Sequence, residues 1–277
     1  MRNSNIIHKE FSCTRDGLKI RGTMFRPAGT AAFPIVVVSH EFMMNRMTTL
    51  RYAYMFAKMG YAAFCYDFNG GGEISQSQGK TTDMSVKTEV KDLKAVIDYA
   101  KTQDYTDEKH LTLMGCSQGG FVSAIVAAEY GVEQVERLIL FYPALSIPDD
   151  ARKGSMIFAR FDPQNVPKTL FCGPIILGRQ YVLDVLHLDP FEIISKYRGP
   201  VLLVHGDFDH IVDHSYSVKA YEAYKEADEE ALAAGKISEL PLIEFKTISH
   251  GEHMFPYPPH KAEACKTVKD FMRRSSL

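Results

Sequence analysis

Short apolar runs alternate with helical patterns along most of the chain. Six runs place apolar, often β-branched side chains at consecutive positions, a pattern typical of strands covered on both faces of a parallel sheet. These runs are residues 33–39, 61–66, 110–114, 137–141, 201–205 and 242–246. Two earlier segments, around residues 11–15 and 19–25, alternate apolar and polar positions and predict an antiparallel hairpin that turns at Asp16-Gly17.

Between these runs, apolar residues recur at helical spacing. Five helices are predicted, at residues 48–59, 85–101, 119–130, 214–230 and 259–274. Gly60 follows the first helix where a terminating glycine is expected, and Ser85 begins the second as its N-cap. The stretch 226–236, rich in alanine and glutamate, is expected to extend the fourth helix into solvent.

Strands that alternate with helices indicate βαβ units and a mostly parallel sheet. The sequence therefore predicts an α/β fold in a single domain of residues 1–277. The alternation stops between about residues 145 and 195, where the chain has five prolines and three glycines. We predict that this stretch is an inserted cap over the edge of the sheet.

Composition and charge exclude several classes of protein. The chain has 277 residues with 32 Lys and Arg against 34 Asp and Glu, a net charge of −2, so it lacks the basic excess of a protein that binds nucleic acid or anionic membranes. No run reaches the ~18 apolar residues of a membrane-spanning helix. The first five residues lack the apolar stretch of a secretory signal, which predicts a cytoplasmic protein, although a mature secreted form would have the same features.

Cysteine and histidine spacing gives no sign of a metal or disulfide framework. The five cysteines are scattered without a C-x-x-C pair, which favours reduced thiols. His8, His110, His187 and His260 have no Cys, Asp or Glu at metal-ligand spacing. We predict neither metal nor cofactor, and a small-molecule substrate as the partner; a homodimer is left open.

The strongest chemical signal is Gly115-Cys116-Ser117-Gln118-Gly119, a G-x-S-x-G motif. It directly follows an apolar strand and directly precedes a helix of small residues, the context of a nucleophile elbow. Such a turn holds its serine in a strained conformation, and glycines on either side avoid steric clashes. The alternative is a chance match in a glycine-containing turn.

A serine hydroxyl is a weak nucleophile and needs a base, which in turn needs an orienting carboxylate. In this type of fold the expected chain order is serine, acid, histidine. The loop after residues 201–205 contains Asp207 and Asp209, at the carboxyl edge of the sheet where ligands bind. We predict that Asp209 is the acid and that Asp207, after Gly206, shapes the turn.

The base is expected after the last strand, where His250 and His253 both occur. We predict His253, because Phe255 beside it would anchor the loop and hold the imidazole in place, with His250 as the alternative. The developing oxyanion needs preorganised N–H donors. We predict the backbone N–H of Gln118 at the start of the helix and that of Phe42 in the loop after residues 33–39, although Phe42 could simply pack in the core.

Together, the elbow, the loop 206–212 and the ending His253-Met254-Phe255 resemble the α/β-hydrolase superfamily. Residues 66–73, 83–86 and 89–99 further resemble the cinnamoyl (feruloyl) esterases of gut and rumen bacteria. This resemblance implies an eight-stranded sheet, a triad of Ser117, Asp209 and His253, and an oxyanion hole at Phe42 and Gln118.

The resemblance also implies that cap residues contact the phenolic ring of the acyl group. Asp150 matches the family's carboxylate for the ring hydroxyl, and Tyr181 matches its tyrosine partner. The alternatives are an ordinary loop carboxylate and a cap-packing tyrosine. The chain departs from the family's usual His-Gly-Phe in having His40-Glu41-Phe42. Glutamate tolerates less well the unusual backbone angles that glycine allows, and its carboxylate would be unfavourable near the oxyanion unless it points away.

These features predict a serine carboxylic-ester hydrolase that works through an acyl-enzyme, acting on hydroxycinnamates or other small aryl or acyl esters. The same triad would also serve an acyl-thioesterase or a peptidase, because the motifs do not determine the leaving group of the substrate. A third possibility is a non-catalytic binding protein that has kept the hydrolase fold.

Overall fold

The computed structural model describes residues 5–72 and 74–275. Residues 1–4, which contribute to the prediction of cellular location, and Glu73, the last residue of one family-like stretch, lie outside the described residues. The chain divides into two compact units, which are described in turn: unit 1 comprises residues 1–111 and 147–188, and unit 2 comprises residues 112–146 and 189–277. The predicted single domain with a cap stays a prediction.

Eight strands form the main sheet, and most neighbouring strands in it are parallel. They include all six predicted apolar runs and the predicted hairpin, which confirms the α/β class. The eight strands are β1 (Ile6–Arg15), β2 (Leu18–Pro27), β3 (Phe33–Ser39), β4 (Ala62–Tyr66), β5 (Thr106–Cys116), β6 (Arg137–Phe141), β11 (Val201–Gly206) and β12 (Ile243–Ile248).

The five predicted helices are also present, with ends that differ by a few residues. They are α1 (Leu50–Lys58), α2 (Val86–Lys101), α3 (Gln118–Tyr130), α7 (Ser215–Ala233) and α8 (Pro258–Arg274). The predicted signals at their ends are confirmed: Gly60 follows α1 with φ +103°, and Ser85 caps α2 through a reciprocal pair of hydrogen bonds with Thr88. None of the helices within the described residues is both long and apolar enough to cross a membrane.

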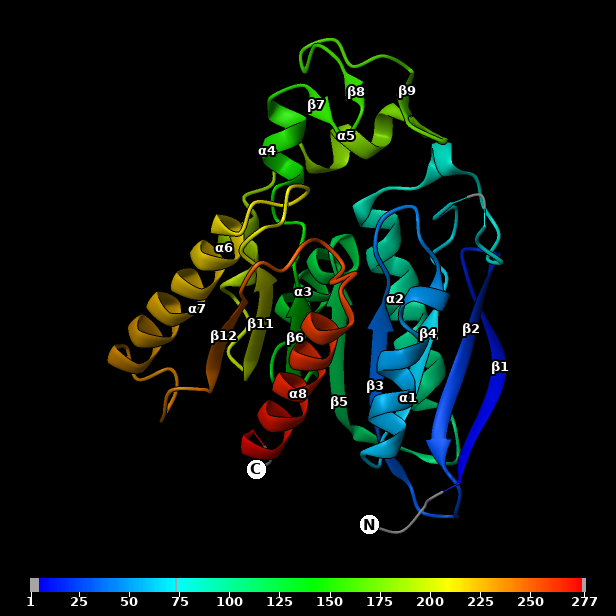
Figure 1. The fold of residues 1–277 in the computed structure, drawn as a ribbon, viewed down its shortest axis with the longest axis vertical. Helices are drawn as coiled ribbons and strands as arrows, with labels where there is room; N and C mark the ends of the chain where they lie inside the picture. Colours follow the sequence, from blue (N-terminus) through cyan, green and yellow to red (C-terminus); the bar gives the residue numbers. More distant parts are fainter. Residues whose placement is uncertain (1–4, 73, 276–277) are drawn as a thin grey trace. The chain divides into compact units, whose positions relative to one another are not determined.

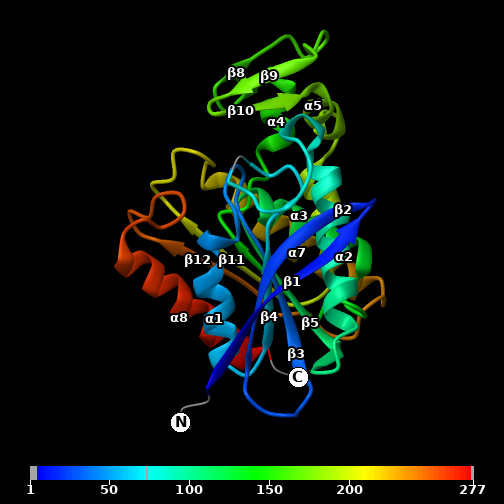
Figure 2. The ribbon, with the colours of Figure 1, turned by 90° about the vertical axis from the view of Figure 1, so that its right-hand side faces the viewer.

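In unit 1 the strand order is β1-β2-β4-β3, with β1 and β2 antiparallel and β3 parallel to β4. The hairpin turns at Asp16 and Gly17, whose φ angles of 51° and 80° fit the tight turn predicted there. Helices α1 and α2 lie on opposite faces of these strands (Figures 1 and 2). The loops that follow β3 and β4 therefore start from a fixed framework.

A buried arginine ties these two loops together. Arg46, in the short helix η1 (Arg46–Thr48), donates from its backbone N and from Nη1 to the carboxylate of Asp67, at 2.8 and 2.6 Å. Its Nη2 also donates to Glu10 at 2.9 Å and to Gln76 at 2.8 Å. Because the Asp67 carboxylate is almost fully buried, this pairing is needed to offset its desolvation.

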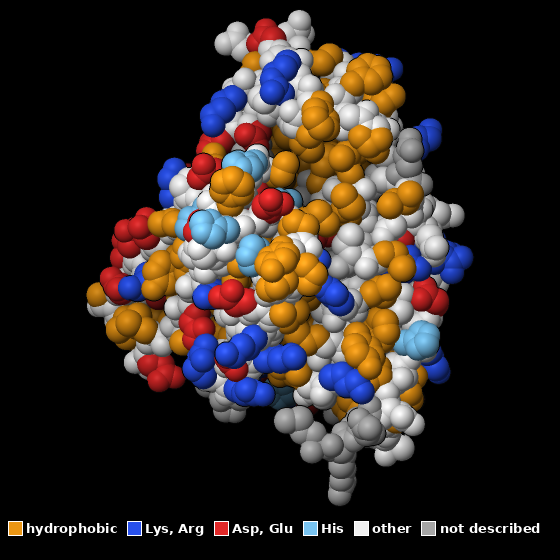
Figure 3. Space-filling model, viewed as in Figure 1, with side chains coloured by type: hydrophobic (Ala, Val, Ile, Leu, Met, Phe, Trp, Pro, Cys, Tyr) orange, Lys and Arg blue, Asp and Glu red, His pale blue; other side chains and the backbone are white. Residues whose placement is uncertain are grey.

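The residues predicted as a cap belong largely to unit 1 and consist of short elements. These are α4 (Ile147–Arg152), β7 (Ser155–Met156), β8 (Ala159–Arg160), β9 (Thr169–Cys172), β10 (Ile175–Gly178) and α5 (Arg179–Val185). The segment is held to the start of α2: Ser85 Oγ donates to Asp184 Oδ2 at 2.6 Å, and Thr81 donates to the backbone oxygen of Ile176 at 2.6 Å. Hydrophobic side chains gather over its hairpins (Figure 3), among them the exposed Phe158 and Phe171.

Unit 2 contains the order β5-β6-β11-β12, with parallel pairing from β5 to β12. Strands β6 and β11 are buried along their whole length, and α3 is buried over its first ten residues. Helices α7 and α8 both contact β11 and β12 and lie on opposite sides of them (Figures 1 and 2). A short helix, α6 (Pro190–Ile194), is capped by Asp189. The loops at the carboxyl ends of β5, β11 and β12 carry the candidate site.

Candidate active site

Ser117 sits on the turn between β5 and α3 in a strained backbone conformation, with φ 52° and ψ −119°. A Cβ on Gly115 would lie 2.1 Å from the backbone oxygen of Gly119, so the turn can close only because residue 115 is glycine. The Ser117 N–H donates to the backbone oxygen of Phe141 at 2.9 Å, which fixes the turn to β6. This geometry fits the predicted nucleophile elbow.

The structure brings the three predicted side chains into one chain of hydrogen bonds. Nε2 of His253 lies 3.0 Å from Oγ of Ser117, and Nδ1 of His253 lies 2.7 Å from Oδ2 of Asp209. An ionised carboxylate can only accept, so Nδ1 carries the proton and Nε2 is free to accept the hydroxyl proton of Ser117. The arrangement can therefore abstract a proton from Ser117.

The loop that carries His253 is held by an aromatic anchor. Phe255 is fully buried, and its ring lies 5.8 Å from that of Phe141 and 5.1 Å from that of Tyr142. Tyr142 also contacts the imidazole of His253, with ring centroids 4.7 Å apart. The predicted anchoring role of Phe255 is confirmed.

The two alternative residues have other contacts. Asp207 accepts a hydrogen bond from the backbone N–H of His250 through its carboxylate, at 2.5 Å. Asp207 thus shapes the loop, as predicted. His250 lies on the exposed outside of the same turn with φ 55°, whereas His253 contacts Ser117.

Asp209 is held by four hydrogen bonds. Its Oδ1 accepts from the backbone N–H groups of Ile211 and Val212 at 2.8 and 3.0 Å, and its Oδ2 accepts from His253 and His205. Burial by itself raises the pKa of Asp209, but the hydrogen bonds from His205 and His253 outweigh it and hold that pKa well below its usual range. The carboxylate therefore stays ionised at neutral pH.

Sequence reasoning missed His205, the last but one residue of β11. Its ring is fully buried, with Nε2 3.1 Å from Oδ2 of Asp209 and Nδ1 2.7 Å from Oγ of Ser217. A histidine in an apolar strand is easily taken for a core residue, and its spacing of four residues from Asp209 was the only signal available. Ser217, on the first turn of α7, carried no signal at all.

The two residues predicted for the oxyanion hole belong to different units, and the hole stays a prediction. Gln118 is the first residue of α3, where backbone N–H groups have no acceptor within the helix. Phe42 lies in unit 1, and its ring is 5.7 Å from that of Tyr181.

In the loop that departs from the family pattern, Met43 takes the left-handed conformation, with φ 60°, and Glu41 does not. Glu41 is buried, and its Oε2 accepts a hydrogen bond from Thr48 at 2.6 Å. Next to it, His40 donates from Nδ1 to the backbone oxygen of Glu41 and accepts at Nε2 from the N–H of Phe68. Burial lowers the pKa of His40, which keeps this imidazole neutral and the loop fixed.

The predicted ring-binding pair also lies in unit 1. Asp150 is half-buried on α4, and Tyr181 is buried on α5. Burial, with Glu89, Cys172 and Asp150 adding to it, holds the pKa of the Tyr181 phenol well above its usual range. Tyr181 therefore keeps its proton and can donate a hydrogen bond, while Asp150 can accept one.

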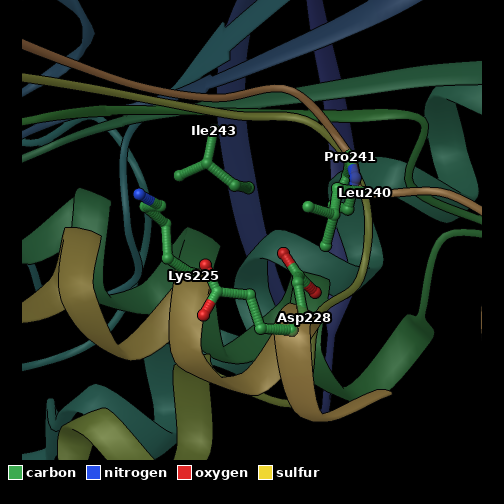
Figure 4. Close-up of a pocket in the computed structure, with 6 residues that line it drawn as sticks. Lys225, Asp228, Leu240, Pro241 and Ile243 are labelled. Carbon is green, nitrogen blue, oxygen red and sulfur yellow. The ribbon is translucent and has the colours of Figure 1, made fainter. Parts of the chain in front are cut away.

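A pocket of about 80 Å³ lies along α7, and none of the residues predicted for the active site lines it (Figure 4). Asp228 lines it, buried to 2% and without a hydrogen-bond partner among the described residues, and burial raises the pKa of this carboxyl to about 6. Most residues of the stretch 226–236 are exposed and α7 continues to Ala233, which fits the predicted solvated extension; Asp228 and Ala231 are the buried exceptions. Arg198 Nε lies 3.6 Å from Asp228 Oδ1 and supplies a counter-charge, so the pair is explained as a structural one.

The described residues contain no group of three His, Cys, Asp or Glu side chains that could hold a metal ion.

Comparison with known proteins places these residues in a wider group. The family model described as "Serine aminopeptidase, S33" matches residues 30–183. Among solved structures, Est1E from Butyrivibrio proteoclasticus with bound ferulic acid superposes with a TM-score of 0.83 at 26% identity, covering 96% of this chain and 98% of Est1E. These matches confirm the predicted α/β-hydrolase fold and the predicted resemblance to feruloyl esterases.

Two curated relatives are similar to this chain over different shares of their own length. Acylamino-acid-releasing enzyme from Rattus norvegicus is 25% identical over 207 residues, which is 72% of this chain but only 27% of that protein. The chain thus spans about a quarter of the length of this relative. YqkD from Bacillus subtilis, an uncharacterised protein, is 25% identical over 267 residues, or 92% of this chain and 76% of YqkD.

The elbow geometry makes a direct prediction about Gly115. Gly115→Ala forces a Cβ against backbone atoms of Gly119 that cannot move independently, so we expect it to lower the free energy of unfolding by about 2–4 kcal/mol. The matched control is Gly120→Ala, whose Cβ would meet Pro143 at 3.1 Å and needs only a small adjustment. Urea unfolding of both variants checks this, and equal stabilities would contradict the elbow as the source of the constraint.

Proposed function

This chain belongs to the serine aminopeptidase S33 family of α/β-hydrolases, and from that membership we propose that it is a serine carboxylic-ester hydrolase that works through an acyl-enzyme. The observation that carries the proposal is the unbroken hydrogen-bonded chain from Ser117 through His253 to Asp209. It ends at a serine whose backbone is held in the strained conformation of a nucleophile elbow.

In the proposed acylation step, Oγ of Ser117 attacks the acyl carbon while Nε2 of His253 takes its proton. Asp209 holds the imidazole in the correct tautomer and stabilises the imidazolium that forms. The tetrahedral intermediate then collapses: the bond from the acyl carbon to the alcohol oxygen breaks, and the imidazolium protonates the leaving alcohol.

Deacylation repeats these steps with water as the nucleophile. His253 takes a proton from water, the hydroxide attacks the acyl carbon, and Oγ of Ser117 leaves with the proton returned by His253. In both steps the negative oxygen is stabilised by the N–H groups of Gln118 and Phe42. Gln118 suits this role because the first turn of α3 favours negative charge.

For the acyl group we propose a hydroxycinnamate. Asp150 accepts a hydrogen bond from the ring hydroxyl, Tyr181 donates one, and the ring of Phe42 beside Tyr181 offers an aromatic contact. The ferulic acid in Est1E supports this choice, since that protein covers nearly the full length of this chain. The cytoplasmic location and a small-molecule ester as the partner belong to the same proposal, with a homodimer left open.

Peptide or acyl-amide cleavage is the second candidate. Two observations favour it: the family is described as serine aminopeptidases, and acylamino-acid-releasing enzymes are among the relatives. A thioester would be cleaved by the same steps. A non-catalytic binding role is disfavoured, because the three side chains make the contacts that catalysis requires and the Glu41 carboxylate is bonded to Thr48.

Ser117→Ala is expected to lower kcat for a short aryl ester by at least about 10⁴-fold, because the nucleophile is lost. The matched control is Ser123→Ala on the same helix, whose hydroxyl has no hydrogen-bond partner among the described residues and should be dispensable. A fluorophosphonate probe should label wild-type protein at Ser117 only. Near wild-type turnover by Ser117→Ala would contradict the proposal.

The acyl specificity is tested with a panel of methyl ferulate, methyl cinnamate, an aliphatic methyl ester, an acyl-CoA and a dipeptide amide. We expect the highest kcat/KM for methyl ferulate. Tyr181→Phe and Asp150→Asn should each lower it by about 10-fold, the value of one hydrogen bond, while leaving methyl cinnamate, which lacks the ring hydroxyl, almost unchanged. Equal losses on both esters would refute these two roles, and faster amide cleavage would favour the peptidase.

A further inference from the structure

We propose that His205 is a positioning residue for the triad, which acts by donating a hydrogen bond from Nε2 to the carboxylate of Asp209. This inference rests on the proposed serine-hydrolase function and extends it to a fourth side chain. His205 touches neither the nucleophile nor the base. His205 acts on Ser117 and His253 indirectly, through the carboxylate of Asp209.

The contacts of His205 define its tautomer. Nε2 lies 3.1 Å from Oδ2 of Asp209 and 3.0 Å from the backbone oxygen of Val212, and both of these atoms are acceptors. Nε2 must therefore carry the proton. Nδ1 is then an acceptor and receives a hydrogen bond from the hydroxyl of Ser217, with the two atoms 2.7 Å apart. The two acceptors at Nε2 select this tautomer, and the Ser217 hydroxyl, which can donate or accept, satisfies Nδ1 by donating to it.

The position of His205 is fixed by burial as well. Its side chain and that of Asp209 are both fully buried, so water cannot replace the hydrogen bond between them. His205 comes from the core strand β11, whereas Asp209 and His253 lie on loops. Because the strand is rigid, the N–H of His205 holds the Asp209 carboxylate in one orientation. In that orientation Oδ2 faces His253.

The second consequence is electrostatic. Oδ2 of Asp209 is shared between two imidazoles, at 2.7 Å from His253 and 3.1 Å from His205. The bond from His205 takes up part of the negative charge that would otherwise act on His253 alone. The other titratable groups around this pair are Asp207, Asp213 and His214, whose ring lies 5.6 Å from that of His205. Within the described part of the chain, none of these three is hydrogen-bonded to the Asp209 carboxylate, so His205 acts on it directly.

Two neutral substitutions separate the donor from the bulk of the ring. His205→Gln places an amide N–H near the position of Nε2 and keeps the donor, whereas His205→Asn ends near the position of Nδ1 and loses it. For His205→Asn we expect kcat on the best ester to fall about 10–100-fold, the value of a hydrogen bond to a charged group, with KM within about 3-fold. For His205→Gln we expect kcat within about 5-fold of wild type.

The pH profile gives a readout that a merely structural role would not change. Loss of the donor leaves more negative charge to stabilise the imidazolium of His253, so the acid limb of kcat/KM should move to higher pH in His205→Asn and stay in place in His205→Gln. Ser217→Ala should leave the acid limb close to its wild-type position, because the two acceptors at Nε2 still fix the tautomer. Fluorophosphonate labelling of Ser117 and thermal unfolding verify that each variant is folded.

The outcomes distinguish this inference from the proposed function. A wild-type enzyme that hydrolyses esters, together with a His205→Asn variant of unchanged kcat and acid limb, overturns the role of His205 and leaves the proposed function standing. A loss of stability without a shift of the acid limb overturns it as well. Activity that survives Ser117→Ala refutes the proposed function itself. If His205→Asn does not fold, the histidine ¹⁵N spectrum of the wild type decides: a His205 protonated on Nδ1 overturns the inference.

Discussion

The candidate site depends on how one buried carboxylate is satisfied. Asp209 is removed from water, which would by itself favour its neutral form, and it remains ionised because two backbone N–H groups and two imidazoles donate to it. Without those donors the carboxylate would not orient His253, and His253 would not hold its free Nε2 toward Ser117. Three elements contribute to this arrangement. The loop after β11 supplies the N–H donors, the loop after β12 supplies His253, and the start of α7 supplies Ser217, which holds His205.

The elements with strong local patterns were predictable from the sequence. Consecutive apolar runs identified the buried strands, Ser85 and Gly60 marked helix ends, and the glycines around Ser117 identified a turn that tolerates no Cβ at position 115. The choice of His253 over His250 followed from the aromatic beside it. These features are local, so short stretches of sequence contain them.

Features that depend on distant contacts were not predictable. His205 lies in an apolar run and therefore looks like a core residue. Only the folded chain brings Ser217 to one side of its ring and Asp209 to the other. In the loop after β3 it is Met43, and not Glu41, that takes the left-handed conformation, which the sequence does not reveal. Asp228 is buried within a mostly exposed segment, beside Arg198, and the sequence spacing does not show this contact.

The most direct test of this account is the protonation of the two imidazoles, which long-range ¹H–¹⁵N NMR of histidine-labelled protein measures near neutral pH. The account predicts that His253 carries its proton on Nδ1 and His205 on Nε2, both toward Asp209. Replacing Asp209 by Asn should disturb both signals. A His253 protonated on Nε2, or a His205 protonated on Nδ1, would mean that the carboxylate does not organise the site, and would contradict the central claim.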